Sequence, residues 1–372
     1  MKYCTRCILP DTRPNILLDE EGVCNACRAH DTKPNIDWSS RDATFREVVC
    51  NAQSRSHGYD CLIPVSGGKD STWQVVKCLE YGLNPLAVTW KTPARTVIGA
   101  ENLANLVNLG VDHIDYQVNP KVEKKFMLEA LEKYGSTAIP MHMALFSIPL
   151  KLAIKLNIPL VVWGENSAFE YGATEDELTG FRLDNRWLKT YGVTHGTTAQ
   201  DWVSKKLTEK ELTPYFGPTD EELVQAKVNA IFLGYYFQWD PEMSADVARK
   251  HGFKSRSDGP KTGYYDFADI DDDFISIHHC VKWYKFGFTR LFDNLSLEIR
   301  NGRMTREQAI DVIRSRGVDL PLEDIRKFCV FVGISEERFF EIAETFRNPS
   351  IWTRRNNIWM MQDFLIANWK WS

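Results

Sequence analysis

Residues 61–71 read Cys61-Leu62-Ile63-Pro64-Val65-Ser66-Gly67-Gly68-Lys69-Asp70-Ser71. The apolar first half is typical of a buried strand, and the polar second half follows two glycines that permit a tight turn. A helix that begins at such a turn offers free backbone N–H groups and the positive end of its dipole to an anion. Lys69 adds a positive charge, whereas Asp70 would repel a bare phosphate, so its presence indicates a bound Mg²⁺. We therefore interpret the stretch as a phosphate-binding loop. The alternative is a plain strand-to-helix turn.

The segments around this loop alternate between strand and helix patterns. We expect strands at residues 61–65, 86–90, 111–118 and 158–163, and helices at residues 44–52, 70–81, 99–109, 121–134 and 140–156. Such alternation predicts an α/β domain with a parallel, doubly wound sheet. After residue 200 helical patterns dominate, with a capping box at Thr305–Gln308 and a further helix start at Ser335.

Four of the nine cysteines lie in the first 27 residues, as the pairs Cys4-x-x-Cys7 and Cys24-x-x-Cys27. Two such pairs can supply a closed tetrahedral set of thiolates, so the spacing predicts a structural zinc knuckle or ribbon. Four unliganded thiols and an iron–sulfur cluster are the alternatives.

The composition is that of an ordinary globular protein, with 44% hydrophobic and 26% charged residues. A net charge of -5 argues against a general nucleic-acid-binding surface. We find no uninterrupted apolar run of about 18 residues that would span a membrane, and no signal-peptide pattern behind Met1. The expected location is the cytoplasm, with no membrane partner.

The loop Ser66–Ser71 resembles the Ser-Gly-Gly-x-Asp-Ser signature of the PP-loop ATP pyrophosphatase superfamily, whose members cleave ATP between the α and β phosphates. The resemblance implies a Rossmann-like domain over residues 36–200, between a Cys4 zinc-binding module at 1–35 and a mainly helical substrate or partner region at 201–372. It also implies which residues bind the nucleotide: Ser66, Gly67, Gly68, Lys69, Asp70 and Ser71 around the pyrophosphate, Thr89 and Trp90 beside the adenine, and Gly164 nearby.

Three later segments are similar to the N-acetyl sugar amidotransferases of lipopolysaccharide O-antigen synthesis and flagellin pseudaminic acid modification. They are Val161–Gly172, Leu233–Tyr236 with Trp239-Asp240, and Lys282–Arg290. That family uses ATP and Mg²⁺ to adenylate the N-acetyl oxygen of a nucleotide-linked sugar acid, which ammonia then displaces to form an acetamidino sugar. One departure is Thr289-Arg290-Leu291, where a Gly-Arg-Ala-type stretch is expected.

Candidate roles follow for single charged residues. Lys69, Asp70 and Glu165 are candidate catalytic residues, and Glu170, Lys282, Lys285 and Arg290 are candidate substrate-binding residues. For the two glutamates the alternative is a solvated loop carboxylate, and for the three cations it is a charged helix face. Adjacent helical residues point apart, so we do not expect His278 and His279 to bind a metal together. We interpret Asp271–Asp273 as a solvated run at a helix start, with a metal site as the alternative.

The source of nitrogen can also be predicted. A glutaminase needs an activated cysteine, and neither an N-terminal cysteine nor a Gly-x-Cys-x-Gly elbow is present. We therefore expect the isolated protein to use free ammonia. The family resemblance implies a separate glutaminase and an ammonia-channelling, cyclase-like partner, docked on the zinc module or the aromatic C-terminal region. The competing interpretations are a PP-loop RNA thiolation enzyme and a non-catalytic nucleotide-binding scaffold.

Overall fold

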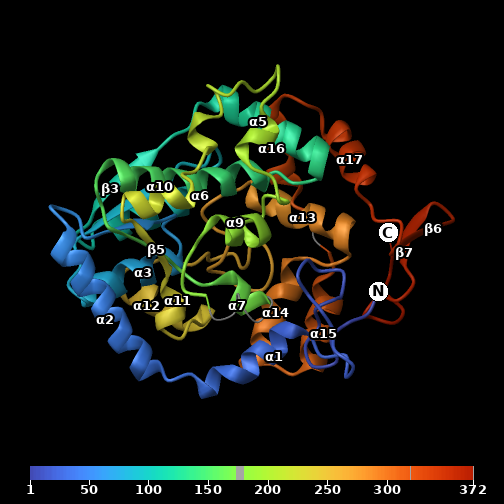
Figure 1. Ribbon diagram of the computed structural model, residues 1–372. Helices are drawn as coiled ribbons and strands as arrows, with labels where there is room; N and C mark the ends of the chain where they lie inside the picture. Colours follow the sequence, from blue (N-terminus) through green and yellow to red (C-terminus); the bar gives the residue numbers. More distant parts are fainter. Residues whose placement is uncertain (173–179, 319, 372) are drawn as a thin grey trace.

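The computed structural model describes residues 1–172, 180–318 and 320–371 (Figure 1). Its centre is a parallel five-stranded sheet in the order β3-β2-β1-β4-β5. The strands are β1 (Cys61–Pro64), β2 (Pro85–Trp90), β3 (Asp112–Tyr116), β4 (Leu160–Trp163) and β5 (Asn229–Phe232). The chain adds strands on one side of β1 and then moves to its other side with β4. The carboxyl ends of β1 and β4 therefore form a topological switch point, where open α/β sheets bind ligands.

Helices cover both faces of the sheet, and side-chain alternation along β1 assigns its residues to the two layers. Leu62 belongs to the core cluster that includes α5 (Pro120–Tyr134) and α6 (Ala138–Lys155). Cys61 and Ile63 belong to the cluster that includes α2 (Trp38–Arg55), α3 (Lys69–Glu80) and α4 (Val97–Val107). Helix α6 is long and apolar enough to cross a membrane, but 61% of it is buried inside the protein, as is usual for a core helix.

The remaining helices mostly lie in the C-terminal half, and those of residues 275–345 lie to the right of the sheet in Figure 1. They are α1 (Asn25–Thr32), η1 (Lys33–Asn35), α7 (Ser167–Tyr171), α9 (Asn185–Tyr191), η2 (Ala199–Trp202), η3 (Thr213–Tyr215), α10 (Asp220–Gln225), α11 (Leu233–Tyr236), α12 (Pro241–Lys250), α13 (Ile275–Phe286), α14 (Arg290–Arg300), α15 (Arg306–Arg316), α16 (Leu322–Val332) and α17 (Glu336–Thr345). The capping box at Thr305 and the side-chain cap at Ser335 are confirmed.

Three strands after residue 200 were not predicted. Strand β5 is only four residues long and pairs with β4 along its whole length, so the sheet includes a segment from the region expected to be helical. Strands β6 (Trp352–Arg355) and β7 (Ile358–Met361) form an antiparallel hairpin near the chain ends (Figure 1). Its turn residues, Asn356 and Asn357, both have positive φ, which asparagine tolerates better than most residues.

Candidate functional site

The loop between β1 and α3 is held in one conformation by its own side chains and by α4. Gly67 has a φ of +89°, and a Cβ atom there would lie 2.7 Å from the backbone nitrogen of Leu103. Only glycine satisfies both conditions. The Ser71 hydroxyl donates to the carbonyl oxygen of Gly68 (3.0 Å), and the Gly68 N–H donates to Oγ of Ser66 (3.2 Å). The sequence thus builds a rigid turn directly before the N-terminus of a 12-residue helix.

This loop forms one wall of a cavity of about 450 Å³, here called the phosphate-loop cavity. It contains predicted site residues from two strand ends: Ser66, Gly68, Lys69, Asp70 and Ser71 after β1, and Gly164 and Glu165 after β4. Lys69 is buried, and its Nζ lies 2.5 Å from Oδ2 of Asp70. The indole N–H of Trp239 donates to Oδ1 of Asp70 at 2.9 Å, so the carboxylate is held at the cavity wall from two sides.

Glu165 faces the same cavity as Asp70, whose carboxylate affects the titration of Glu165. Burial and, to a lesser extent, the Asp70 carboxylate raise the pKa of Glu165 to about 7, against the charge of Lys69. The pKa of Glu165 is thus close to neutral pH, and a second carboxylate lies beside it. A divalent cation bound between the two groups would stabilise the ionised form of Glu165.

Thr89 and Trp90 lie in a smaller adjoining cavity of about 210 Å³. This cavity shares Ser66, Val65, Leu145, Asp269 and Asp271 with the phosphate-loop cavity. The predicted adenine-side residues and the predicted phosphate-side residues are therefore neighbours in space.

The expectation for Asp271–Asp273 is wrong. Asp272 is only 7% exposed, and burial raises its pKa to about 7. The Thr96 N–H donates to the carbonyl oxygen of Asp271, and Asp272 forms an isolated β-bridge with Arg95. These contacts hold the run against the start of α4, and α13 begins only at Ile275. Asp271 and Asp272 are therefore part of the cavity walls, and Asp273 pairs with Lys261 and Lys327.

The third cavity, of about 650 Å³, is here called the cationic cavity because four basic side chains line it: Arg13, Lys282, Lys285 and Arg290. Among the residues that the structure describes, two carboxylates line it, and each is engaged. Nε of Arg13 lies 2.6 Å from Oδ1 of Asp293, and Nε of Arg290 lies 3.2 Å from Oδ2 of Asp269. The excess of positive charge makes this cavity suited to an anionic ligand.

The two lysines of the cationic cavity differ in their partners. Nζ of Lys285 donates to the carbonyl oxygen of Tyr134 at 2.7 Å. Lys282 makes no hydrogen bond or ion pair with the part of the chain that the structure describes, and burial lowers its pKa to about 8, against the attraction of Asp293. An ammonium group half-buried without a partner is energetically costly, and an anionic ligand would relieve that cost.

The phosphate-loop and cationic cavities are contiguous. Their common wall consists of His142, Ser167, Tyr191, Val193, Asp269 and Arg290. Asp269 lines all three cavities and has a φ of +56°, which is uncommon outside glycine. Although its burial alone would raise the pKa of Asp269, the charge of Arg290 holds it well below its usual range. A ligand in one cavity can therefore reach a ligand in the other beside an ionised carboxylate and a guanidinium.

Glu170 and the adjacent histidines His278 and His279 differ in their positions relative to the cavities. Glu170 is 5% exposed, lines none of the three cavities and has Nζ of Lys33 within 2.7 Å and 3.0 Å of its carboxylate oxygens. The pair joins α7 to the N-terminal module. His278 and His279 are both buried at the cationic cavity, and no metal-binding group that includes them is found among the described residues.

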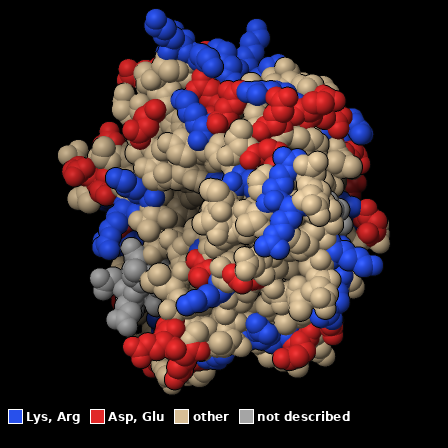
Figure 2. Space-filling view, turned by 90° about the vertical axis from the view of Figure 1, so that its right-hand side faces the viewer, with Lys and Arg blue, Asp and Glu red and all other residues tan. Residues whose placement is uncertain are grey.

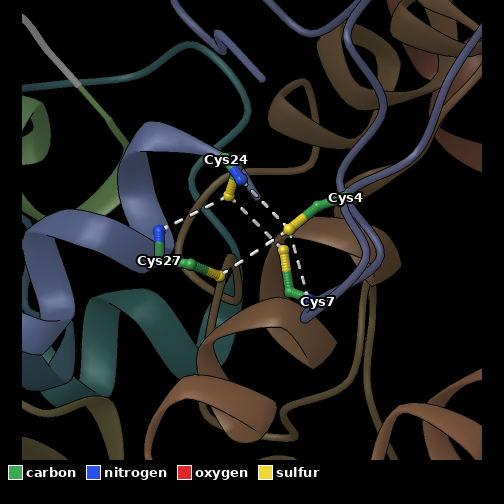
Figure 3. A group of neighbouring side chains, drawn as sticks. All are labelled: Cys4, Cys7, Cys24 and Cys27. Carbon is green, nitrogen blue, oxygen red and sulfur yellow. Dashed lines mark hydrogen bonds between the residues drawn. The ribbon is translucent and has the colours of Figure 1, made fainter. Parts of the chain in front are cut away.

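The four N-terminal cysteines converge (Figure 3), and all four are buried. Their sulfur atoms lie within 4.8 Å of one another, with Cys7 to Cys24 at 3.6 Å and Cys4 to Cys27 at 3.9 Å. Tetrahedral zinc with Zn–S bonds of about 2.3 Å requires sulfurs about 3.8 Å apart, so the set fits the ion. The N–H groups of Cys7 and Cys24 donate to the sulfur of Cys4, which is how thiolates are stabilised in such sites.

The N-terminal cysteine module (residues 1–35) also reaches the cationic cavity. Nε of Arg306 donates to the carbonyl oxygen of Cys7 at 3.0 Å, and the Thr12 hydroxyl donates to the carbonyl oxygen of Phe286 at 2.5 Å. These contacts dock the module on α13–α15 and place Arg13 in the cavity wall. Sequence reasoning missed Arg13, His142 and Asp269. Arg13 lies in a turn-rich segment between cysteine pairs, and no motif surrounds the other two residues.

Comparisons with known proteins give a match for part of the chain. Residues 261–365 match the family model described as "LPS biosynthesis protein WbpG-like, C-terminal domain". This stretch includes Lys282, Lys285 and Arg290 of the cationic cavity. No curated protein sequence matches. Among solved structures, NMN synthetase from Francisella tularensis aligns with 12% identity and a TM-score of 0.32, over 75% of this chain and 92% of that one.

Proposed function

We propose that this chain is an ATP-dependent amidotransferase of lipopolysaccharide (O-antigen) biosynthesis. It adenylates the N-acetyl oxygen of a nucleotide-linked sugar acid, and ammonia then replaces that oxygen to give an acetamidino sugar. The observation that carries the proposal is the wall shared by the phosphate-loop cavity and the cationic cavity. ATP in the first cavity and an anionic sugar in the second would meet at Asp269 and Arg290. The match of residues 261–365 to a family of LPS biosynthesis supports the substrate class.

The chemistry explains why two adjoining cavities are needed. The oxygen of an amide is a very poor leaving group, so ammonia does not displace it in water. Attack of that oxygen on the α-phosphorus of ATP forms a C–O–P linkage and releases pyrophosphate, after which the oxygen can leave as part of AMP. The protein must hold the two substrates in line and exclude water from the adenylate.

In the phosphate-loop cavity, Ser66, Gly67, Gly68, Lys69 and Ser71 would hold the leaving pyrophosphate through backbone N–H groups, hydroxyls and one charge. Asp70 and Glu165 would hold Mg²⁺, which when bound neutralises phosphate charge. Each oxygen of Asp70 accepts one protein contact, from Lys69 or Trp239, and its second lone pair could still coordinate the cation. Thr89 and Trp90 would border the adenine in the small cavity, with Gly164 beside the phosphates.

In the cationic cavity, Lys282, Lys285 and Arg290 would bind the carboxylate and diphosphate of the sugar substrate, together with Arg13. Guanidinium groups suit these anions because they donate two parallel hydrogen bonds. Glu170, buried against Lys33, would act through the position of α7 instead of touching the substrate. The four cysteines would hold zinc in a closed set, so the ion would shape the module and supply no open coordination position.

The cysteines also support an external source of ammonia. None of the nine lines any of the three cavities, and Cys50 alone is exposed. A glutaminase nucleophile would need an accessible site with a neighbouring base. A separate glutaminase with a channelling, cyclase-like partner would supply the nitrogen.

The position of the cysteines outside the three cavities also disfavours RNA thiolation through a catalytic cysteine. On the face shown in Figure 2, basic and acidic side chains are interspersed, without one continuous basic surface for RNA.

The test uses the purified full-length chain with ATP, Mg²⁺ and a panel of nucleotide-linked diacetamido sugar acids. At least one member should stimulate exchange of labelled pyrophosphate into ATP, and an ammonium salt should then yield a product in which mass spectrometry finds NH in place of O. Glutamine should not replace ammonium. Absence of sugar-dependent exchange across the panel would contradict the proposal, and glutamine-driven turnover by the chain alone would contradict the external nitrogen source.

A further inference from the structure

His142 stands at the junction of the two large cavities. It lies in the first turns of α6 and is one of the six side chains common to the phosphate-loop cavity and the cationic cavity. The other three histidines of the cationic cavity, His195, His278 and His279, line that cavity alone. In the proposed reaction the carbonyl carbon of the N-acetyl group must lie at this junction. The sugar that carries it would occupy the cationic cavity, and the AMP group attached to its oxygen would occupy the phosphate-loop cavity.

The tautomer of His142 follows from its hydrogen bond. Nδ1 lies 2.9 Å from the carbonyl oxygen of Ala138, one turn earlier in the same helix. A carbonyl oxygen can only accept, so Nδ1 must carry the hydrogen, and in the neutral ring Nε2 must carry a lone pair. Within residues 1–172, 180–318 and 320–371, no hydrogen bond to Nε2 is found.

The surroundings keep this ring neutral. Burial, with a smaller contribution from the charge of Lys282, lowers the pKa of His142 to about 4, against the hydrogen bond to Ala138. The other three histidines are less suited to act as a base at the junction, because each lines the cationic cavity alone and has a ring nitrogen near another polar group. Nε2 of His195 lies 3.5 Å from Nζ of Lys285, Nδ1 of His278 lies 3.4 Å from Oγ of Ser136, and Nε2 of His279 lies 3.4 Å from Asp269.

We propose that Nε2 of His142 is the general base for the attack of ammonia, an inference that rests on the proposed function. The nitrogen of ammonia forms a bond to the imidate carbon of the adenylated N-acetyl group, and one of its protons passes to Nε2. The C–O bond to the adenylate then breaks, and its electron pair leaves with the oxygen of AMP. The imidazolium returns its proton to the nitrogen already carried by the sugar, so the ring ends neutral and the product is an amidinium ion.

The variant His142→Gln tests the assignment because it retains polarity and removes the base. Sugar-dependent pyrophosphate exchange should remain close to the wild-type rate, since it precedes the attack. Formation of the amidine should fall by roughly 10²–10⁴-fold, the usual contribution of a general base. In the smaller variant His142→Ala, added imidazole should restore part of the amidine formation and leave exchange unchanged.

His251 provides a matched control. Its Nδ1 makes the same contact, 2.9 Å from the carbonyl oxygen of Val247 one turn earlier, but the residue is exposed and lines none of the three cavities. His251→Gln should change neither exchange nor amidine formation. Circular dichroism and thermal melting establish that each variant is folded.

The outcomes separate the two proposals. If the wild-type chain shows no sugar-dependent exchange, the proposed function fails. If the wild type exchanges and forms amidine, and His142→Gln does both at normal rates, the role of His142 is refuted while the function stands. A parallel loss of exchange and amidine formation in folded His142→Gln would also overturn the role, because it would assign His142 to binding or adenylation.

Discussion

Arg13 and Asp293 are 280 positions apart in the chain, yet Nε of the first lies 2.6 Å from Oδ1 of the second. Asp293 is 1% exposed and Arg13 also donates to the carbonyl oxygen of Tyr171 at 3.3 Å. This contact joins the cysteine module to α14 and to the end of α7. The wall of the cationic cavity is therefore completed by a segment whose conformation depends on the cysteine site.

Loss of the Arg13 guanidinium should weaken sugar binding and spare ATP. Arg13→Gln should raise the KM for the nucleotide sugar by about 10–100-fold. This increase corresponds to the loss of one charge-assisted hydrogen bond, which contributes about 1.5–3 kcal/mol. The KM for ATP should stay near the wild-type value, because Arg13 does not line the phosphate-loop cavity. Steady-state kinetics with each substrate varied in turn measure both constants.

Two controls accompany this variant. Arg13→Gln leaves Asp293 buried without its partner, so the double variant Arg13→Gln/Asp293→Asn should recover stability without recovering sugar affinity. Arg6→Ala removes an arginine of the same module whose ion pair with Asp31 is exposed on both sides, and it should leave both KM values unchanged. Equal loss of ATP and sugar affinity in Arg13→Gln would contradict the assignment.

Lys69 should be required for adenylation. Lys69→Met removes a buried charge from the phosphate-loop cavity, and sugar-dependent pyrophosphate exchange should fall by about 10²–10³-fold, as for loss of one transition-state donor. Lys77→Met is the matched control, because Lys77 lies on the same helix, pairs with Glu80 at the surface and lines none of the cavities. Near-normal exchange in Lys69→Met would refute the role of the loop.

The parts of the structure that could be predicted are those with local signals. Strands β1–β4 and helices α3–α6 begin and end within two residues of the expected bounds, because apolar periodicity and the glycine pair mark them. The convergence of Cys4, Cys7, Cys24 and Cys27 is confirmed for the same reason, since spacing alone constrains it. The short strand β5 was not predicted, because a run of four mainly apolar residues is also compatible with a helix.

The cavity walls could be predicted only in part. Lys69, Asp70 and Glu165 follow strands of one sheet, so topology alone brings them to one edge. Arg13, His142 and Asp269 come from three segments whose docking depends on tertiary packing. The burial of Asp272 likewise depends on a bridge to Arg95, which is far away in the chain. The acidic composition of residues 271–273 alone predicts that they are exposed to solvent, but the long-range contact with Arg95 buries Asp272 instead.

The cysteine module should contain one zinc ion per chain. Metal analysis of the purified protein should find zinc and not iron, and Cys7→Ser should lose the metal and melt at a lower temperature, because metal binding contributes folding free energy. Cys50→Ser, which alters the exposed cysteine, should retain both metal and stability. Removal of zinc by a chelator should also weaken sugar binding through Arg13, which isothermal titration with the sugar alone can detect. A metal-free protein with unchanged melting temperature would contradict the prediction.

Glu123 should make the folded chain less stable as the pH rises. It is 1% exposed, its Oε1 has no hydrogen-bond partner in the described structure, and burial raises its pKa to about 8, against a contact with Trp90. Below the unfolded pKa of about 4.5 both states hold the proton, and between that value and about 8 only the folded state does. Ionisation therefore stabilises the unfolded chain and not the folded chain in this interval, and the free energy of unfolding falls as the pH rises. Glu123→Gln should exceed the wild type in free energy of unfolding by an amount that grows up to about pH 8. A constant difference in urea denaturation between pH 5 and 8 would contradict this.

Glu165 should couple metal binding to pH between about pH 6 and pH 8. Its pKa is raised to about 7 by burial and then by the Asp70 carboxylate, so without metal the group is mostly protonated at pH 6 and mostly ionised at pH 8. A proton competes with Mg²⁺ for the carboxylate, and the apparent affinity for Mg²⁺ should therefore rise about tenfold across that interval, following the ionised fraction. The measurement is the Mg²⁺ dependence of sugar-dependent pyrophosphate exchange at each pH. Glu165→Gln should bind Mg²⁺ more weakly and should show only the dependence that comes from the ionisation of ATP itself. If wild type and Glu165→Gln change in parallel with pH, Glu165 does not bind the metal, and its carboxyl group must serve another purpose in the phosphate-loop cavity.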